Sequence, residues 1–226
     1  MAHSARSTSG NMLIYILGAI FLMGLLIVLL KGSFQEGTGI DAEKTLITIN
    51  EVQRYGAELE RGVRYIMQNG HSESEIRFAR DTTDVGYGLI TDRPERQVFS
   101  PQGGAVEYRL PPQGVNDGTP WQFYGDTHIP DMGTDGALAH SELIAVLPQV
   151  TESFCRALNQ NAKQPIDLTQ TSIVPCVTVG FFNGDFVDEP PERLLDENEI
   201  PNRPVTQACG RCGDGTYHYF RVLLSR

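Results

Sequence analysis

The stretch ARSTSGNMLIYILGAIFLMGLLIVLLKGS, from Ala5 to Ser33, contains no charged residue between Asn11 and Leu30. As a helix with a rise of about 1.5 Å per residue, this apolar run is close to the ~30 Å that the hydrocarbon core of a bilayer requires. A secretory signal has a shorter apolar core of ~7–15 residues and a small-residue cleavage site, which the end of this run, IVLLKGSF, does not offer. The run therefore predicts a transmembrane helix over residues 11–31.

The residues on either side of this run, and the cysteines, predict which compartment holds the rest of the chain. The leader 1–10 contains Arg6 and the α-amino group, and Lys31 stands alone on the other side, so the count of basic groups is near parity and favours a cytoplasmic N-terminus only slightly. All four cysteines follow the apolar run, and an even number suits an oxidising compartment. We expect a single-pass protein of the bacterial inner membrane with its head, residues 71–226, in the periplasm.

The composition of the chain limits the kinds of protein that the part after the apolar run can be. The 226 residues have a formal net charge of −10 and no basic cluster, which excludes a nucleic-acid partner. Beyond the apolar run roughly 195 residues remain, enough for one ordinary globular domain. The 23 glycines and 13 prolines lie almost entirely in this part and indicate many loops and turns.

A helical stem is expected between the apolar run and the head, within residues 32–70. After the glycine-rich hinge KGSFQEGTGI, the spacing of apolar residues predicts a helix over residues 41–70, with Asp41 as its N-cap. Its apolar stripe recurs at three- and four-residue spacings and consists of Ile49, Val52, Gly56, Leu59, Val63 and Ile66. Such a stripe must be buried, either against the chain's own head or against neighbouring stems, and the sequence is compatible with both.

The head is expected to be rich in β-structure with one further helix. Short segments such as SEIRFAR, QVFSP, AVEYRL and WQFYG combine β-branched and aromatic residues and are separated by Pro and Gly. Residues 141–161 (SELIAVLPQVTESFCRALNQN) predict a helix that Pro148 either kinks or splits in two, and residues 215–226 predict a terminal strand. The expected fold class is α+β, with a long N-terminal transmembrane helix and a helical stem that carries a β-rich periplasmic head.

This order of segments resembles type IV pilins and type II secretion pseudopilins: a hydrophilic leader ending in Gly10, an apolar helix, a stem, and a β-rich head with a C-terminal cysteine loop. The resemblance implies cleavage by a dedicated peptidase after Gly10, with Asn11 as the first residue of the mature chain. It also implies that the apolar helices pack together as the core of a filament, with the heads outside. Tyr15 stands where most pilins have a glutamate, which favours a minor subunit over a major one.

The resemblance therefore implies a structural subunit of a cell-envelope filament or secretion assembly, whose partners are the membrane and other pilin-like subunits. The assembly helix would use Met12, Leu13, Tyr15, Leu17, Phe21 and Leu25, and the stem would use Ile49, Val52, Leu59, Val63 and Ile66. Exposed aromatic residues near Trp121–Tyr124 would carry the partner specificity of the head. The alternative function is that of a single-pass, membrane-anchored periplasmic binding or adaptor domain that forms no filament.

The cysteines have three possible roles. The motif CGRC could be a redox centre of a tethered thiol–disulfide enzyme, but a strand follows it where such a centre needs a helix N-terminus. A zinc site is disfavoured because the other two cysteines form no second C-x-x-C pair. Structural disulfides are the default outside the cytosol, and four cysteines allow three pairings. The residues are Cys155, Cys176, Cys209 and Cys212.

No enzyme and no cofactor are expected. The sequence contains no nucleophile elbow, no H-E-x-x-H helix and no phosphate-binding glycine loop. The acidic loop with Asp185, Asp188 and Asp196 is a weak candidate for calcium, since its oxygen ligands lack EF-hand spacing and a prolyl pair interrupts them. A solvated acidic loop is the favoured interpretation.

Overall fold

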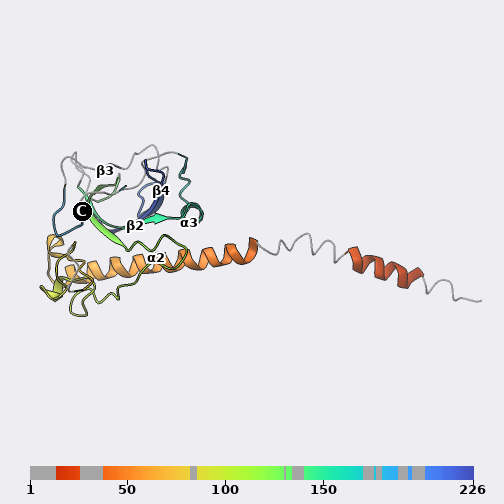
Figure 1. The fold of residues 1–226 in the computed structure, drawn as a ribbon, viewed down its shortest axis with the longest axis horizontal. Helices are drawn as coiled ribbons and strands as arrows, with labels where there is room; N and C mark the ends of the chain where they lie inside the picture. The colour runs from red at the N-terminus through yellow and green to blue at the C-terminus, as the bar shows by residue number, and fades with distance from the viewer. Residues whose placement is uncertain are drawn as a thin grey trace, which may run out of the picture. The chain divides into compact units, whose positions relative to one another are not determined.

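A computed structural model describes residues 14–25, 38–81, 86–129, 131–133, 140–169, 176, 180–187, 193–194 and 202–226. The chain divides into two compact units, Met1–Lys44 and Thr45–Arg226. In the first unit residues 14–25 form a helix. The second unit contains the β-sheet and most of the long helix α2, Thr38–Gln68 (Figure 1).

The predicted transmembrane helix is corrected by the structure. Among the described residues, none of the helices combines the length and the apolar character needed to cross a membrane. Within the predicted span the structure describes a helix over residues 14–25, which is about 18 Å long at 1.5 Å per residue. The longer α2 carries charged side chains along its length. The expected fold class with its membrane helix, and the expected place in the inner membrane, are therefore both wrong, and an α+β fold is what the structure supports.

Helix α2 confirms the helix predicted after the hinge, although it begins three residues before the predicted N-cap at Asp41. Its apolar stripe is buried in the main core together with Phe123, Leu147 and Tyr219 of the sheet. At Gly56 the helix approaches the sheet so closely that a Cβ atom would lie 2.5 Å from Cδ of Arg221. The Arg221 guanidinium crosses this glycine and forms an ion pair with Glu60 at 2.8 Å.

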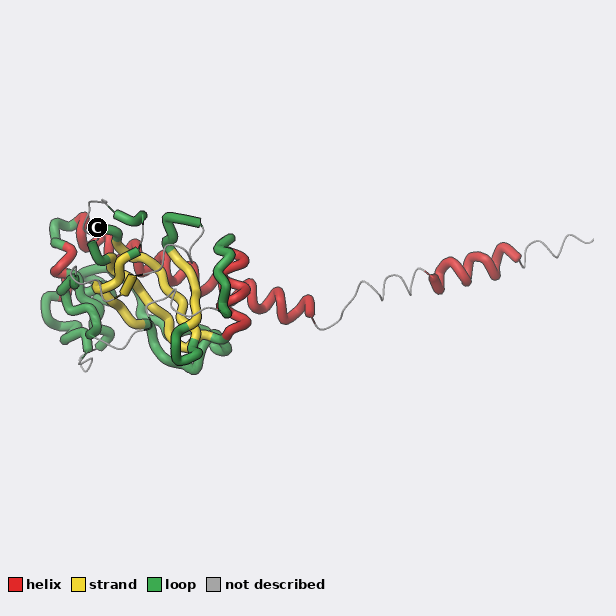
Figure 2. The backbone as a smooth tube through the Cα atoms, turned by 90° about the horizontal axis from the view of Figure 1, so that it is seen from above, coloured by secondary structure: helices red, strands yellow, loops and turns green. Residues whose placement is uncertain are grey.

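Five strands form one sheet in the order β3-β1-β2-β5-β4, and Figure 2 shows them side by side. The strands are β1 (Gln122–His128), β2 (Glu142–Val150), β3 (Arg193–Leu194), β4 (Gln207–Arg211) and β5 (Tyr217–Leu224). β3 pairs in parallel with β1, and the other neighbours are antiparallel. The terminal strand that the alternation predicted is β5, and it lies between β2 and β4.

The helix predicted over residues 141–161 is wrong in its first half. Residues Glu142–Val150 form strand β2, and only Glu152–Asn161 form a helix, α3. β2 is buried on both faces, so its sequence is a continuous apolar run, and such a run does not distinguish a buried strand from a buried helix. Pro148 lies where the pairing of β2 with β5 shifts register, and Thr151 caps α3 by accepting a hydrogen bond from the Phe154 N–H.

Between α2 and β1 the chain is mostly irregular in its described part. It contains two short 3-10 helices, Glu73–Glu75 and Pro94–Arg96. Where the sequence predicted strands, Arg77 and Gln97 form an isolated bridge, and a second one joins Gln113 and Asn116 further along the chain. Aromatic side chains from this region fill the main core, and the ring of Phe78 stacks on that of Phe123 with centroids 3.9 Å apart. A second, smaller core covers the opposite face of the sheet and includes Phe220 and Val222.

We predict that Leu59→Ala lowers the free energy of unfolding by about 2–5 kcal/mol, because it leaves a cavity under α2. Leu59 is completely buried, whereas Leu110 is 65% exposed. The matched control Leu110→Ala should change the free energy of unfolding by less than about 0.5 kcal/mol. Urea denaturation of both variants measures the difference, and equal losses would contradict the position of Leu59 in the core.

Burial of Tyr219 predicts a loss of stability at alkaline pH. Burial raises the pKa of the Tyr219 hydroxyl from its ordinary value of 10.0 to about 12. Below pH 10 the contribution of Tyr219 to stability is constant; above it the unfolded chain ionises first, so this contribution falls by about 3 kcal/mol up to pH 12, and buried Tyr55 adds a fall of its own. Tyr219→Phe should flatten this fall, as measured by urea denaturation between pH 9 and pH 12, whereas Tyr65→Phe, at an exposed position, should keep the wild-type slope.

Candidate functional site

The helix over residues 14–25 is apolar on all sides and exposed on all sides. Its large apolar side chains are between 48% and 76% exposed, among them the predicted assembly residues Tyr15, Leu17, Phe21 and Leu25. A helix that is hydrophobic all round is normally buried, and an isolated helix of this length is marginal in water. The apolar side chains of this segment are therefore expected to pack against another apolar surface. The predicted residues Met12 and Leu13, and the predicted processing residues Gly10 and Asn11, lie outside the described residues.

The predicted stem residues lie inside the protein. Each of them is at most 1% exposed and belongs to the main core of the same chain: Ile49, Val52, Leu59, Val63 and Ile66. This face of α2 is therefore occupied by the chain's own sheet and loops. Among the residues of α2 from 43 to 68, whose exposure the structure describes, the large exposed apolar ones are Leu46, Ile47 and Tyr65, at 49%, 61% and 51%.

Side chains and loops outside the sheet bind backbone groups of the edge strand β4 and of β1, the neighbour of the short edge strand β3. Along β4, the Asn159 side chain donates to the Cys209 carbonyl at 2.7 Å and accepts from the Cys209 N–H at 2.9 Å, so it imitates a neighbouring strand. Beside β1, the N–H groups of Phe182 and Val187 donate to the carbonyls of Phe123 and Gly125. Backbone groups bound in this way are not available to a strand from a second molecule.

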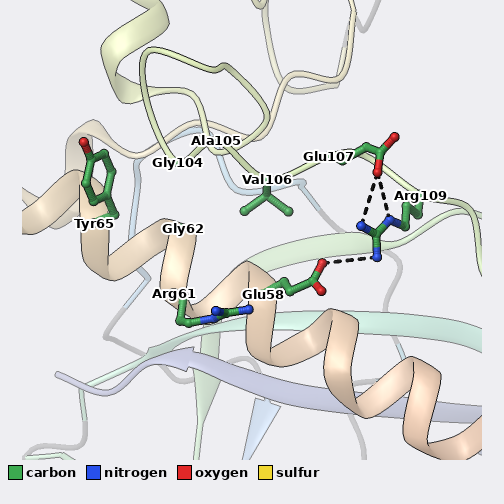
Figure 3. Close-up of a pocket in the computed structure, with 9 residues that line it drawn as sticks. All are labelled: Glu58, Arg61, Gly62, Tyr65, Gly104, Ala105, Val106, Glu107 and Arg109. Atoms are coloured by element: carbon green, nitrogen blue, oxygen red, sulfur yellow. Dashed lines mark hydrogen bonds and ion pairs between the residues drawn. The ribbon is translucent and has the colours of Figure 1, made fainter.

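A groove of about 470 Å³ runs between α2 and the loop that follows Gly103 (Figure 3). Its floor consists of Gly62, Ala105 and Val106, and charged side chains line both walls. Helix and loop touch at Gly62, where a Cβ atom would lie 2.5 Å from Cγ2 of Val106. Tyr65 stands at one end of the groove, as Figure 3 shows.

The two arginines that line the groove differ in their ionic partners. Arg109 binds Glu58 and Glu107, each at 3.2 Å, and its backbone N–H donates to the Tyr55 hydroxyl at 3.0 Å. Burial raises the pKa of that tyrosine. Arg61 donates only to the Ala57 carbonyl, at 3.4 Å, and forms no ion pair within the described part of the chain. Small-molecule pockets are mostly apolar with few polar groups, so this charged groove better suits a protein surface.

A row of residues on the solvent side of α2 passes along this groove, and we call it the outer stripe. Its members follow spacings of four, three, four, three and four residues: Ile47, Glu51, Arg54, Glu58, Arg61 and Tyr65. Residues at these spacings lie on one helix face. Our sequence analysis missed the outer stripe because it followed apolar periodicity only; alternating charge at helical spacing was the available signal.

The four cysteines form two disulfides, which confirms the expected structural bridges. Cys155 of α3 is bonded to Cys209 of β4, and Cys176 is bonded to Cys212, with Cα atoms 5.3 and 5.5 Å apart. The two cysteines of CGRC thus pair with distant partners and not with each other. The first bridge attaches α3 to the edge strand, and the second attaches residue 176 to the turn between β4 and β5.

Other residues singled out from the sequence do not gather into a site. Trp121 and Tyr124 are each 2% exposed, so the expectation of an exposed aromatic patch there is wrong. Asp185 is exposed, and Asp188 and Asp196 lie outside the described residues. Among the described residues, no group of three or more His, Cys, Asp or Glu side chains could hold a metal ion.

Comparisons with known protein families, with curated proteins and with solved structures find no match to this chain. The assignment of function therefore depends on the surfaces described above.

We predict that mild reduction opens Cys176–Cys212 before Cys155–Cys209. Cys176 is exposed, whereas Cys155 and Cys209 are completely buried, and an accessible sulfur is attacked faster by a thiolate. Limited treatment with dithiothreitol, alkylation and peptide mass spectrometry should find label at Cys176 and Cys212 at least about tenfold sooner. Simultaneous labelling of all four cysteines would contradict the difference in burial.

Proposed function

We propose that this protein is a structural subunit of a filament or secretion assembly, comparable in role to a minor pilin or pseudopilin. In this proposal the helix over residues 14–25 packs against the same helix of further subunits. The Thr45–Arg226 unit is the head that each subunit contributes to the assembly.

The observation that carries this proposal is the exposure of the helix over residues 14–25. Burial of one large apolar side chain is worth about 1.5–3 kcal/mol, and this helix presents a series of them from Ile14 to Leu25. Its small residues leave room for close contacts, since a Cβ atom at Gly18 or Gly24 would meet nothing within 4 Å. Equivalent helices from other subunits offer an apolar surface of the same kind.

The rest of the described chain supports assembly through helices over assembly through strands. Asn159 binds the backbone of Cys209 in the edge strand β4, and Phe182 and Val187 bind the backbone of β1, so these groups are not available to a strand from another subunit. The two disulfides are typical of proteins that fold in an oxidising compartment, where such assemblies form. The leader, the apolar helix and the C-terminal cysteine loop agree with the resemblance to pilins.

We predict that Phe21→Glu abolishes this assembly. Phe21 is 72% exposed, so the substitution leaves the monomer intact, but it places a carboxylate in the proposed helix contact. A desolvated, unpaired charge costs several kcal/mol, which corresponds to an association at least about 100-fold weaker. Sedimentation velocity in detergent-free buffer should find wild-type species larger than a dimer and should find these species absent in Phe21→Glu.

The matched control is Leu110→Glu, which adds the same charge at an exposed leucine of the other unit. It should sediment like the wild type. A wild-type chain without species larger than a dimer, or a Phe21→Glu variant that still forms them, would contradict the proposed function.

A further inference from the structure

The outer stripe of α2 has a charge pattern that is complementary to the same pattern read in the opposite chain direction. In chain order it consists of an apolar residue, an acid, a base, an acid, a base and a second apolar residue, from Ile47 to Tyr65. Read in the opposite direction, each acid falls opposite a base. From this pattern we infer that the outer stripe binds the outer stripe of a second copy of this chain, antiparallel and about a two-fold axis level with residue 56.

The alignment follows from the residue numbers. Two antiparallel helices centred on residue 56 bring Glu51 level with Arg61 of the second copy, and Arg54 level with Glu58. The same alignment brings Ile47 level with Tyr65. Each of these pairs occurs twice because the contact is isologous, so the interface is closed and self-complementary.

Parallel arrangements fit the pattern less well. In register, a parallel pair places Glu51 on Glu51 and Arg54 on Arg54, and like charges at close range are repulsive. A parallel pair shifted by one turn restores opposite charges, but it places Ile47 against Glu51 and leaves Tyr65 against Arg61. Only the antiparallel pair matches all charges and also matches the two apolar ends.

The exposure and pairing of the individual residues favour this contact. Glu51 and Arg61 are exposed and form no ion pair within the described part of the chain. Ile47 is 61% exposed and Tyr65 is 51% exposed, although both are large apolar residues of a helix whose other face is buried. At the centre, Glu58 binds Arg54 of its own helix at 3.5 Å and Arg109 at 3.2 Å, and the exposed side chain of Arg54 can also reach Glu58 of a second copy.

The groove in Figure 3 receives the end of the second helix. Arg61 and Tyr65 belong to α2, and the loop with Gly104, Ala105 and Val106 faces this part of the helix across the groove. In the antiparallel pair, Ile47 of the second copy lies beside Tyr65 at this end of the groove, and Glu51 of the second copy reaches Arg61. Exposed ion pairs contribute orientation more than affinity, so burial of the two apolar pairs supplies the attraction.

This dimer is a second association surface that lies wholly within the Thr45–Arg226 unit. It does not use the helix over residues 14–25, and it does not depend on the proposed function. The two associations can therefore fail separately.

Pairwise disulfide trapping in the full-length chain tests the inference. All four native cysteines are in disulfides, so Glu51→Cys and Arg61→Cys each add one reactive thiol. A disulfide forms only between Cα atoms closer than about 7 Å, whereas positions 51 and 61 of one helix lie about 15 Å apart along the axis. On mild oxidation, a mixture of the two variants should form a cross-linked dimer at least about tenfold faster than either variant alone.

Two controls make the result specific. A mixture of Glu51→Cys with Gln68→Cys, an exposed residue of the same helix, should cross-link no faster than the single variants. Repeating the experiment with Phe21→Glu in both chains removes the proposed contact of residues 14–25 and should leave the cross-linking rate unchanged. Rapid cross-linking of Glu51→Cys alone, or equal rates in all samples, would overturn the antiparallel dimer.

A charge swap provides a second, independent measurement. Glu51→Arg should lower the dimer population of the Phe21→Glu chain in sedimentation equilibrium by about tenfold or more, since two like charges then face each other twice. Glu51→Arg combined with Arg61→Glu should restore it, because the same pairs return with their signs exchanged. A double variant as weak as Glu51→Arg would overturn the inference.

Discussion

The rest of the structure depends on one contact, between α2 and the β-sheet. It lies at Gly56, where the Arg221 side chain crosses the helix to reach Glu60. The helix can approach the sheet because Gly56 has no side chain, and the apolar residues on the same face are then removed from water. The ion pair of Arg221 with Glu60 connects the helix to strand β5 at one position along the helix axis. This contact determines which residues of α2 after Lys44 face the sheet and which face solvent.

The surfaces left over for partners follow from this arrangement. One face of α2 is buried in the chain's own core, Asn159 binds the backbone of Cys209 in the edge strand β4, and the segment 180–187 binds the backbone of β1. The opposite face of α2 and the helix over residues 14–25 are the two helical surfaces that expose several large apolar side chains among the described residues. Both surfaces are helical, and both suit association with further copies better than the binding of a small molecule.

Some of this could be predicted from the sequence. The stripe from Ile49 to Ile66 identified α2 because its spacing has the period of a helix, and the alternation from Tyr217 to Leu224 identified β5 because its spacing has the period of a strand. β2 was mistaken for a helix because burial on both faces removes any period. The cysteine pairing needed three-dimensional structure, since the sequence does not say that α3 lies beside β4.

The remaining errors concern what covers an apolar surface. A run of apolar residues indicates that its exposure to water is unfavourable, but it does not say what covers it. The run after Asn11 predicted a membrane span, which the described helices do not provide. For the apolar stripe from Ile49 to Ile66, the sequence was compatible with burial against the chain's own head or against neighbouring stems. In the structure it is buried within its own chain. The outer stripe was missed because its central four residues are charged, and a search for apolar periodicity passes over them.

Proximity between the helices of different copies is the central claim, and a spin label measures it most directly. Ala19→Cys places one nitroxide in the exposed helix over residues 14–25, since the native cysteines are all bonded. The account predicts dipolar broadening of the electron paramagnetic resonance spectrum, which disappears when labelled chains are diluted with unlabelled ones. A sharp spectrum that is the same before and after this dilution would contradict it.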